Sequence, residues 1–290
     1  MAASTGIAAS RTSGYGFGAT DVVLSVDEVE KAAHELAAHG PDIHRLDELC
    51  TGAPVLAIDG LVAGYGHMEI LHGIDLRVGS GQSLCLIGPN GAGKSTVLHS
   101  IQGFTRIVSG TVRIGGRDVT HMPAQRKLRK AGIAYVLQDS SVFPDMSVEE
   151  NLLLGGHLFG SNREARRAAD RVFERYPRLA ERRRQRAAVL SGGERRLLEI
   201  ARALIMEPSV LLVDEPSIGL EPRYIDMVFE ILADLQRSEH RTIIMVEQNA
   251  KKGLEFADLG YVLVSGTIAL AGRGRELLDN PDVGRLFLGA

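Results

Sequence analysis

The chain has 290 residues, of which 44% are hydrophobic and 24% are charged, and this ordinary globular composition excludes an intrinsically disordered chain. The longest apolar runs, such as 210–213 and 261–264, are far shorter than the roughly 20 residues that a membrane-spanning helix needs. A formal net charge of −3 supplies no basic field for a phosphate backbone, so the sequence predicts no nucleic-acid partner.

Residues 1–53 are predicted to form an N-terminal extension. The first part is rich in Ala, Ser, Gly and Thr without periodic apolar residues, which is typical of a flexible segment. Ser25 and Glu28 form an S-x-x-E capping box, so we expect a short helix near 26–39, and one or two further helical turns within 42–50. No secretory signal pattern is present, and we expect the chain to stay in the cytosol. The extension is either a passive tail or a docking or regulatory segment.

From residue 54 to residue 290, short apolar stretches alternate with helical patterns, which is typical of βα units over a largely parallel sheet. The predicted strands are 83–87, 133–137, 210–213, 242–246 and 261–265. The predicted helices are 95–102, 148–155, 163–176, 194–205, 225–237 and 251–256. Residues 148–190 show helical patterns without intervening strands, which predicts a helical subdomain at about 145–190. The basic run 126–130 is expected to be a solvated helix face.

A glycine-rich stretch follows the first of these strands and opens the next helix. It matches the pattern G-x-x-x-x-G-K-[ST], which binds phosphate in this strand-to-helix context. Backbone N–H groups turn toward the β-phosphate, Lys94 can bridge the β- and γ-oxygens, and Ser95 offers its hydroxyl to Mg²⁺. The residues expected to bind nucleotide here are Gly88, Pro89, Asn90, Gly91, Ala92, Gly93, Lys94, Ser95 and Thr96.

The apolar strand 210–213 ends in two acidic residues, Asp214 and Glu215. An acid at the carboxyl end of such a strand can hold the Mg²⁺ shell, and this role is expected for Asp214. The next carboxylate can orient and deprotonate the attacking water, so Glu215 is expected to be the general base. The histidines lack paired metal-ligand spacing, and Mg²⁺ is the only metal that the sequence predicts.

A third motif, Leu190-Ser191-Gly192-Gly193-Glu194, precedes a helical pattern. Ser191 and Glu194 form another capping box. Two glycines are poor helix formers, at up to about 1 kcal/mol each, but they let an anion approach the helix N-terminus closely. We therefore expect a second phosphate site at this helix start.

In their order, GPNGAGKST, Gln138, LSGGE and LLVDEP resemble the nucleotide-binding subunit of ATP-binding cassette (ABC) transporters, over about residues 54–290. The resemblance implies an α/β fold: a P-loop NTPase core with a mostly parallel sheet, an antiparallel β subdomain and an inserted α-helical subdomain. It implies ATP and Mg²⁺ as cofactors, adenine stacking on Tyr65, and a Gln138 side chain near Mg²⁺. It also implies a head-to-tail dimer, in which the signature residues 191–194 of one subunit meet ATP bound to the other.

The sequence departs from the family pattern at the switch position after the strand 242–246. There the family usually has histidine, and this chain has Gln248. Glutamine can donate a hydrogen bond to phosphate but carries no proton at physiological pH, which leaves Glu215 as the base and Gln248 as a phosphate contact. The signature carries Glu194 instead of glutamine, and the stretch 217–221, which falls where the family has its D-loop, ends in Glu221 instead of aspartate. Because both replacements keep a polar side chain, we expect them to adjust the rate of ATP hydrolysis without abolishing it. The alternative is a cassette that binds ATP but barely hydrolyses it.

Several stretches narrow the resemblance to one group of importers. VEQNA, SIGLEP, VFPDMSVEENLLLGG and the ending ELLDNPDVGRLFLG resemble the second cassette subunit of branched-chain amino acid importers, a group that also carries urea, short amides or other amino acids. One alternative is a lipopolysaccharide-export cassette, which has a similar signature but normally keeps the switch histidine. The other is a soluble ABC ATPase acting on nucleic acid or ribosome, which usually has a long coiled coil or two cassettes.

One phosphate loop and one signature in a chain make no complete composite site, so a second cassette is expected, identical or different. The resemblance further implies separate integral membrane permease subunits, docked near Gln138 and the helical subdomain, and a periplasmic binding protein reached indirectly. The expected location is peripheral, at the cytoplasmic side of the bacterial inner membrane.

Overall fold

The structure is a computed structural model that describes residues 40–138 and 141–288. The predicted helix near 26–39 and its capping box therefore lie outside the described residues. The turns expected within 42–50 are present as helix α2 (Ile43–Leu49), which Asp42 caps by accepting a hydrogen bond from the backbone N–H of Arg45. Within the described ranges, no helix has the length and apolar character needed to cross a bilayer.

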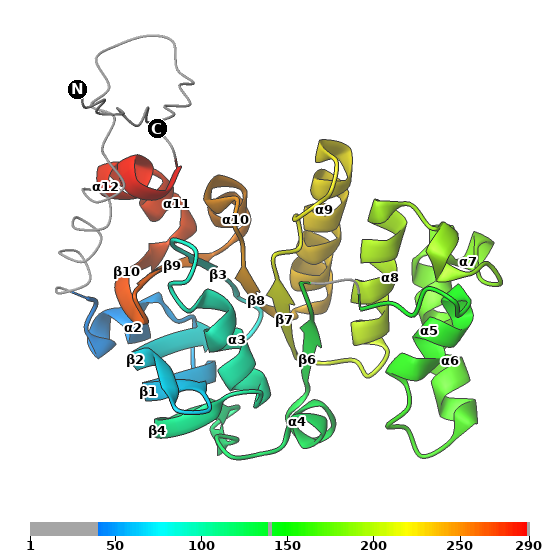
Figure 1. The fold of residues 1–290 in the computed structure, drawn as a ribbon, viewed down its shortest axis with the longest axis horizontal. Helices are drawn as coiled ribbons and strands as arrows, with labels where there is room; N and C mark the ends of the chain where they lie inside the picture. Colours follow the sequence, from blue (N-terminus) through cyan, green and yellow to red (C-terminus); the bar gives the residue numbers. More distant parts are fainter. Residues whose placement is uncertain (1–39, 139–140, 289–290) are drawn as a thin grey trace, which may run out of the picture.

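The central sheet has six strands in the order β10-β9-β3-β8-β7-β6, and all are parallel except β10 (Figure 1). Their bounds are β3 (Ser83–Ile87), β6 (Ile133–Val136), β7 (Val210–Asp214), β8 (Thr242–Val246), β9 (Leu259–Val264) and β10 (Thr267–Arg273). Successive side chains point to opposite faces of a strand, so Leu84 and Leu86 enter one core while Cys85 and Ile87 enter another. Burial on both faces explains the continuous apolar runs of these strands.

A second, antiparallel sheet has the order β2-β1-β4-β5. Its strands are β1 (Pro54–Tyr65), β2 (Met68–Gly79), β4 (Arg106–Ile114) and β5 (Arg117–Asp118). Helix α3 (Lys94–Gln102) contacts strands of both sheets, and α4 (Ala124–Ala131) packs against β6. The layers of a P-loop core with an antiparallel β subdomain are thus confirmed.

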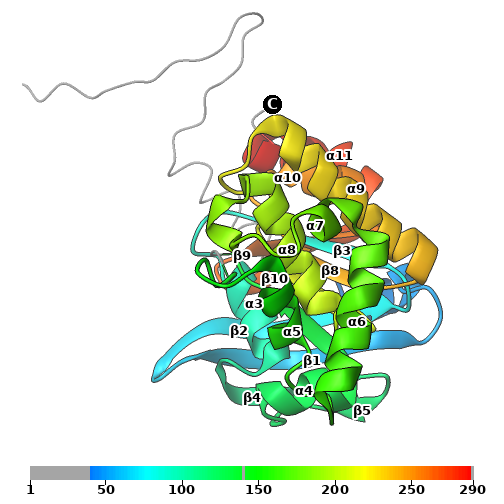
Figure 2. The same ribbon diagram turned by 90° about the vertical axis from the view of Figure 1, so that its right-hand side faces the viewer.

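Helices on the other face of the central sheet complete the core, and a group of helices extends beyond it (Figures 1 and 2). The former are α8 (Gly192–Leu204), α9 (Pro222–Glu239), α10 (Ala250–Phe256), α11 (Gly274–Leu278), α12 (Pro281–Val283) and the last turn η2 (Gly284–Leu288). The latter are α5 (Val148–Gly155), α6 (Asn162–Arg175), α7 (Pro177–Glu181) and η1 (Ala187–Val189). Helix α8 belongs to both groups, because Leu197 and Ala201 pack in the helical cluster while Ile200 packs beneath the sheet.

The expectation that the basic run 126–130 is a solvated face is wrong for Lys127. This side chain is fully buried, and its Nζ donates a hydrogen bond to the backbone oxygen of Ile101 at 2.7 Å. The carbonyls at the end of a helix lack partners within the helix, and a cation there is favourable. Lys127 of α4 therefore caps the carboxyl end of α3, while Arg126 and Lys130 are exposed.

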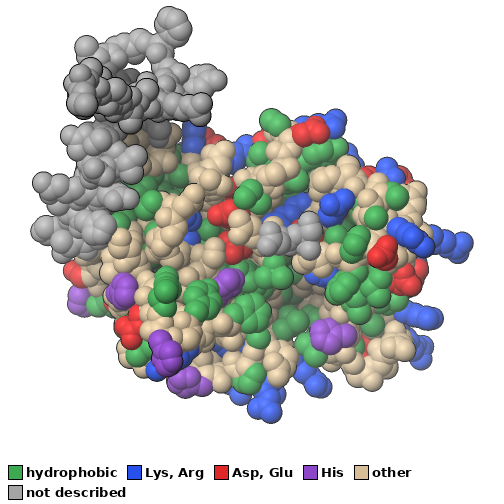
Figure 3. Space-filling view, in the orientation of Figure 1, with side chains coloured by type: hydrophobic (Ala, Val, Ile, Leu, Met, Phe, Trp, Pro, Cys, Tyr) green, Lys and Arg blue, Asp and Glu red, His purple; other side chains and the backbone are tan. Residues whose placement is uncertain are grey.

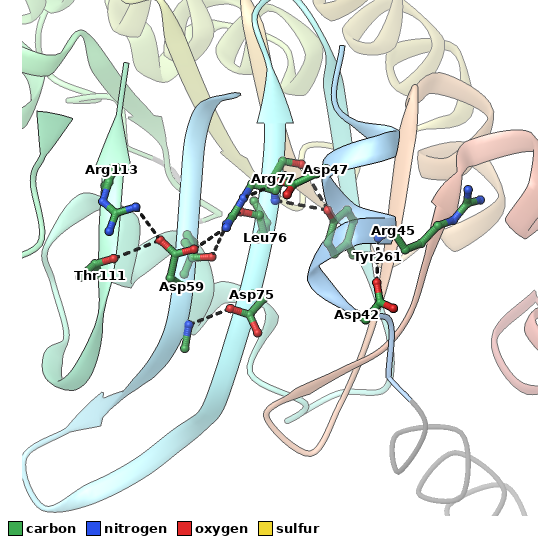
Figure 4. A network of polar contacts seen from close by, with 12 residues as sticks. Asp42, Arg45, Asp47, Asp59, Asp75, Leu76, Arg77, Thr111, Arg113 and Tyr261 are labelled. Atoms are coloured by element: carbon green, nitrogen blue, oxygen red, sulfur yellow. Dashed lines mark hydrogen bonds and ion pairs between the residues drawn. The ribbon is translucent and has the colours of Figure 1, made fainter. Parts of the chain in front are cut away.

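Helix α2 is anchored to the core by a polar network around Arg77 (Figure 4). The guanidinium of Arg77 pairs with Asp47 of α2 at 3.2 Å and with Asp59 of β1, and it donates to the backbone oxygen of Ile58 at 2.7 Å. Leu46 of α2 is fully buried in the core beside the antiparallel sheet. The segment just before residue 54 therefore packs as part of the same core.

Candidate functional site

Four loops meet at one edge of the central sheet. Strands β3, β8, β7 and β6 are neighbours and parallel, so their carboxyl ends lie at the same edge, where ligands of such sheets bind. The phosphate loop follows β3, and Gln248 follows β8. Asp214 ends β7, and Gln138 comes two residues after β6. The topology thus brings together residues that lie far apart in the sequence.

The phosphate loop is shaped by a glycine and closed by a lysine. Gly88 has φ +145°, and a Cβ there would lie 2.1 Å from the backbone oxygen of Leu263, so only glycine fits. Lys94 is buried, and its Nζ donates to the backbone oxygens of Gly88 at 2.9 Å and Pro89 at 3.0 Å. Burial lowers the pKa of Lys94, although the Glu215 carboxylate opposes this effect. The ammonium faces into the loop whose N–H groups suit an anion.

Asp214 is buried and fixed through both carboxylate oxygens. Its Oδ1 accepts a hydrogen bond from the Ser95 hydroxyl at 3.0 Å, and its Oδ2 accepts one from the Tyr135 hydroxyl at 2.7 Å. Hydroxyl and carboxylate oxygens are ligands that Mg²⁺ accepts, so the Ser95 and Asp214 oxygens would suit this ion. In residues 40–138 and 141–288, no group of three or more His, Cys, Asp or Glu side chains could hold a metal by itself.

Glu215 sits beside this pair in a strained backbone conformation. Its φ is +42°, a left-handed value that is uncommon outside glycine and that clusters at functional sites. Its Oε2 accepts a hydrogen bond from the Gln138 side-chain amide at 2.7 Å. Burial, followed by the neighbouring Asp214 carboxylate, raises the pKa of Glu215 above its ordinary value. A carboxylate with a raised pKa is suited to take a proton from water.

Tyr65 ends β1 with 44% of its surface exposed. Its hydroxyl is hydrogen-bonded to Nδ1 of His99 in α3, and the rings of His99 and Tyr135 meet edge to face with centroids 5.7 Å apart. The aromatic ring of Tyr65 thus lies beside the helix that follows the phosphate loop and keeps an accessible surface for stacking.

The switch position is exposed, and the residue before it is buried. Gln248 follows β8 at the surface, whereas Glu247 is only 1% exposed. The Glu247 Oε1 accepts hydrogen bonds from the Ser217 hydroxyl at 2.6 Å and from the Asn249 backbone N–H at 2.9 Å. Glu247 therefore ties the D-loop segment to the loop that carries Gln248.

The signature begins α8 with the predicted capping box. The Ser191 backbone N–H donates to Glu194 Oε2 at 2.9 Å, and the Glu194 N–H donates to the Ser191 hydroxyl at 3.3 Å. A Cβ on Gly193 would lie 2.2 Å from the ring of Tyr224, whereas one on Gly192 would only touch Leu220 at 3.5 Å. Packing against Tyr224 is therefore one reason for glycine at residue 193, beside access for an anion.

Two side chains of this site, Tyr135 and Glu247, are absent from the residues predicted from the sequence. Tyr135 contacts an aspartate 79 residues away, and Glu247 contacts a serine 30 residues away. The only local signal is a polar group within or directly after an apolar strand, which does not identify the partner.

A groove of about 670 Å³ lies between the core and the helical subdomain. Hydrophobic side chains gather across the middle of the face drawn in Figure 3, where the core meets these helices. Phe104 and Phe143 line the groove and are each about half exposed, and Leu137 lies between them in the sequence and is 40% exposed. Exposed apolar surface of this kind is typical of a protein contact site.

The comparisons with known proteins agree with this geometry. Residues 71–218 match the ABC transporter family. The chain is 42% identical to the high-affinity branched-chain amino acid transport ATP-binding protein BraG of Pseudomonas aeruginosa, over 81% of this chain and the whole of that protein. It is 36% identical to the probable branched-chain amino acid transport ATP-binding protein LivF of Archaeoglobus fulgidus, over 79% and 96% of the two chains. A nucleotide-free ATP-binding cassette from an ABC transporter superposes with a TM-score of 0.72 at 27% identity, covering 82% of this chain and all of the other.

Proposed function

Because the chain belongs to the ATP-binding proteins of ABC transporters, an ATPase family that couples hydrolysis to transport, we propose that it energises a bacterial importer of branched-chain amino acids or related amides. The observation that best supports ATP hydrolysis is that the side chains of Ser95, Asp214, Gln138 and Glu215 lie together at one edge of the sheet. The two relatives described above are named for branched-chain amino acid transport, which favours this cargo class over lipopolysaccharide export.

The proposed nucleotide site uses the residues of the sheet edge. Residues 88–96 bind the phosphates of ATP, with Lys94 moving its donors from loop carbonyls to phosphate oxygens, and Tyr65 stacks on adenine. Ser95, Asp214 and Gln138 hold Mg²⁺, which, when bound, neutralises charge on the phosphate oxygens. Glu215 orients the attacking water and takes its proton, and Gln248 donates a hydrogen bond to the γ-phosphate.

The proposed assembly is a pair of cassettes under permease subunits. The signature residues 191–194 complete the ATP site of a second cassette, where the start of α8 presents N–H groups to the γ-phosphate. The groove beside Phe143 receives a cytoplasmic segment of a permease, because its apolar lining needs a partner. The chain would then act as a peripheral subunit at the cytoplasmic side of the inner membrane, with a periplasmic binding protein supplying the cargo indirectly.

A pull-down from the native membrane tests this proposal. Glu215→Gln should keep ATP binding and abolish turnover, which traps the assembled state for identification of co-purifying subunits by mass spectrometry. Recovery of two permeases, a second cassette and an amino-acid-binding protein supports the importer. Recovery of lipid-export components, or of no membrane protein, contradicts it.

A further inference from the structure

Arg196 and Glu199 form an ion pair inside the protein, on α8. The Arg196 Nη1 and Glu199 Oε2 atoms are 2.7 Å apart, and only 6% and 4% of the two side-chain surfaces are exposed. Burying two charges costs free energy that the pair alone repays poorly, so further hydrogen bonds are needed to hold it. The partners of this pair are therefore informative.

The guanidinium of Arg196 donates to two backbone carbonyls in different loops. Its Nη1 donates to the oxygen of Leu137 at 2.8 Å, and its Nη2 donates to the oxygen of Asp214 at 3.0 Å. Leu137 immediately precedes Gln138, and Asp214 immediately precedes Glu215. The side chains of Gln138 and Glu215 share the 2.7 Å hydrogen bond described above. One planar group thus holds the two peptide units from which this catalytic pair projects.

Glu199 and a third side chain of the same helix, Arg202, hold Ser141. The Ser141 backbone N–H donates to Glu199 Oε1 at 3.0 Å, and Arg202 Nη1 donates to the Ser141 oxygen at 2.5 Å. Residues 196, 199 and 202 are spaced three apart, so they follow one another along one face of α8. The helix that begins with the signature therefore also fixes both the residue before Gln138 and a residue shortly after it.

We propose that Arg196 is a positioning residue for ATP hydrolysis, which sets the placement of Gln138 against Glu215, with Glu199 as its counter-charge. The inference rests on the roles proposed above for Gln138 and Glu215. A guanidinium suits this role because its fork of donors reaches two carbonyls at once, whereas the ammonium of lysine is a compact point charge.

The test is Arg196→Lys in the full-length chain, with ATP hydrolysis measured over a range of protein and ATP concentrations. We expect kcat to fall about tenfold to 100-fold, since misplacing a catalytic group by about 1 Å has an effect of that order. KM for ATP should stay within about twofold, because the phosphate loop and Tyr65 are untouched. Arg183→Lys is the control: Arg183 also pairs with two carboxylates, those of Glu149 and Asp170 in the helical subdomain, and the kcat of this variant should not change. A wild-type kcat for Arg196→Lys overturns the inference.

A charge-free replacement separates positioning from folding. Replacing both members of a buried ion pair by apolar residues is often neutral for stability, so Arg196→Met with Glu199→Leu should remain folded where Arg196→Met alone fails. We expect the double variant to keep the low kcat, and a return to the wild-type rate would show that the pair only supports the fold.

Two further variants show whether Arg196 acts through Gln138. In a Gln138→Ala background, Arg196→Lys should lower kcat much less than in the wild type, because residues that act as a unit are not additive. Independent, multiplicative effects would overturn the inference.

Glu215→Gln, measured in the same assay, separates the further inference from the proposed function. Turnover by that variant contradicts the proposed base and leaves the comparison of Arg196 with Arg183 intact.

Discussion

Two adjacent acids, Asp214 and Glu215, are given different environments by their neighbours. Asp214 is buried and accepts hydrogen bonds on both oxygens, from Ser95 and Tyr135. Glu215 has its pKa raised by burial and by the Asp214 carboxylate, and Gln138 is its hydrogen-bond donor. These different surroundings support the two roles proposed above, in which Asp214 would hold Mg²⁺ and Glu215 takes the proton of the attacking water.

Lys127 supports the phosphate-loop helix from the opposite end. Its ammonium lies against the last carbonyls of α3, with 2.7 Å between Nζ and the Ile101 oxygen. Burial lowers the pKa of Lys127 from 10.5 to about 8. Between these two values the unfolded chain binds more protons than the folded chain, so the contribution of Lys127 to stability is lowest below pH 8 and rises toward pH 10.5.

This pH dependence is testable with Lys127→Met. From about pH 7 to about pH 9, the free energy of unfolding of the wild type should rise relative to the variant by about 1 kcal/mol, as measured by urea denaturation. Lys130→Met, on the exposed side of the same helix, should show no such change. A wild-type-to-variant difference that stays constant with pH would mean that Lys127 keeps its ordinary pKa.

At the scale of elements, α2 depends on one buried arginine. Arg77→Met removes the ion pairs to Asp47 and Asp59 and the hydrogen bond to the Ile58 oxygen. Losing charge-assisted hydrogen bonds from a buried group should lower the free energy of unfolding by about 2–4 kcal/mol and expose α2 to proteases. Urea denaturation and limited proteolysis measure the two effects.

Arg45→Gln is the control for this prediction. Arg45 also links α2 to the core, through Glu276, but its side chain is 45% exposed. Exposed ion pairs contribute at most about 1 kcal/mol, so this variant should keep α2 protected. Equal losses from the two variants would contradict a special role for Arg77.

The strands of the central sheet apart from β10 could be predicted from sequence, and those of the second sheet could not. Strands β3 and β8 match the predicted 83–87 and 242–246 because strands buried on both faces read as unbroken apolar runs. Strands β1 and β2 are absent from the predicted strands. Their pairing shifts register several times, which breaks the alternation of apolar and polar residues that marks a half-buried strand.

The site shows the same division. Contiguous motifs gave the phosphate loop, Asp214, Glu215 and the signature, because their chemistry lies in neighbouring residues. The contacts of Tyr135 and Arg196 join positions 79 and 59 residues apart, and no spacing rule relates such positions in a single sequence. The burial of Lys127 could not be predicted for a related reason, because the basic run 126–130 does not indicate which of its side chains will pack against the end of a neighbouring helix.

At the scale of the whole molecule, the capping box of α8 allows the paired assembly to be tested. In ATP and Mg²⁺, Glu215→Gln should elute as a dimer in size-exclusion chromatography with light scattering, because ATP binds but is not hydrolysed. Adding Ser191→Asp should return it to a monomer: aspartate caps a helix as well as serine does, so the fold is kept, but its charge repels the partner's γ-phosphate. Ser191→Asn caps equally well without the charge and should retain more dimer. A dimer unaffected by the aspartate would place the signature elsewhere.

The sharing of α8 between two cores constrains how related proteins can exchange parts. Leu197, Leu198 and Ala201 of α8 and its C-cap residue Ile205 pack with the helical subdomain, while Ile200 and Leu204 pack beneath the sheet. A chimera that receives residues 142–190 from a relative obtains the helical subdomain from the donor but keeps the α8 side chains of the recipient against which that subdomain packs. Such a graft requires that the donor's apolar side chains match those four recipient positions, so these positions can be compared between parents before a gene is made.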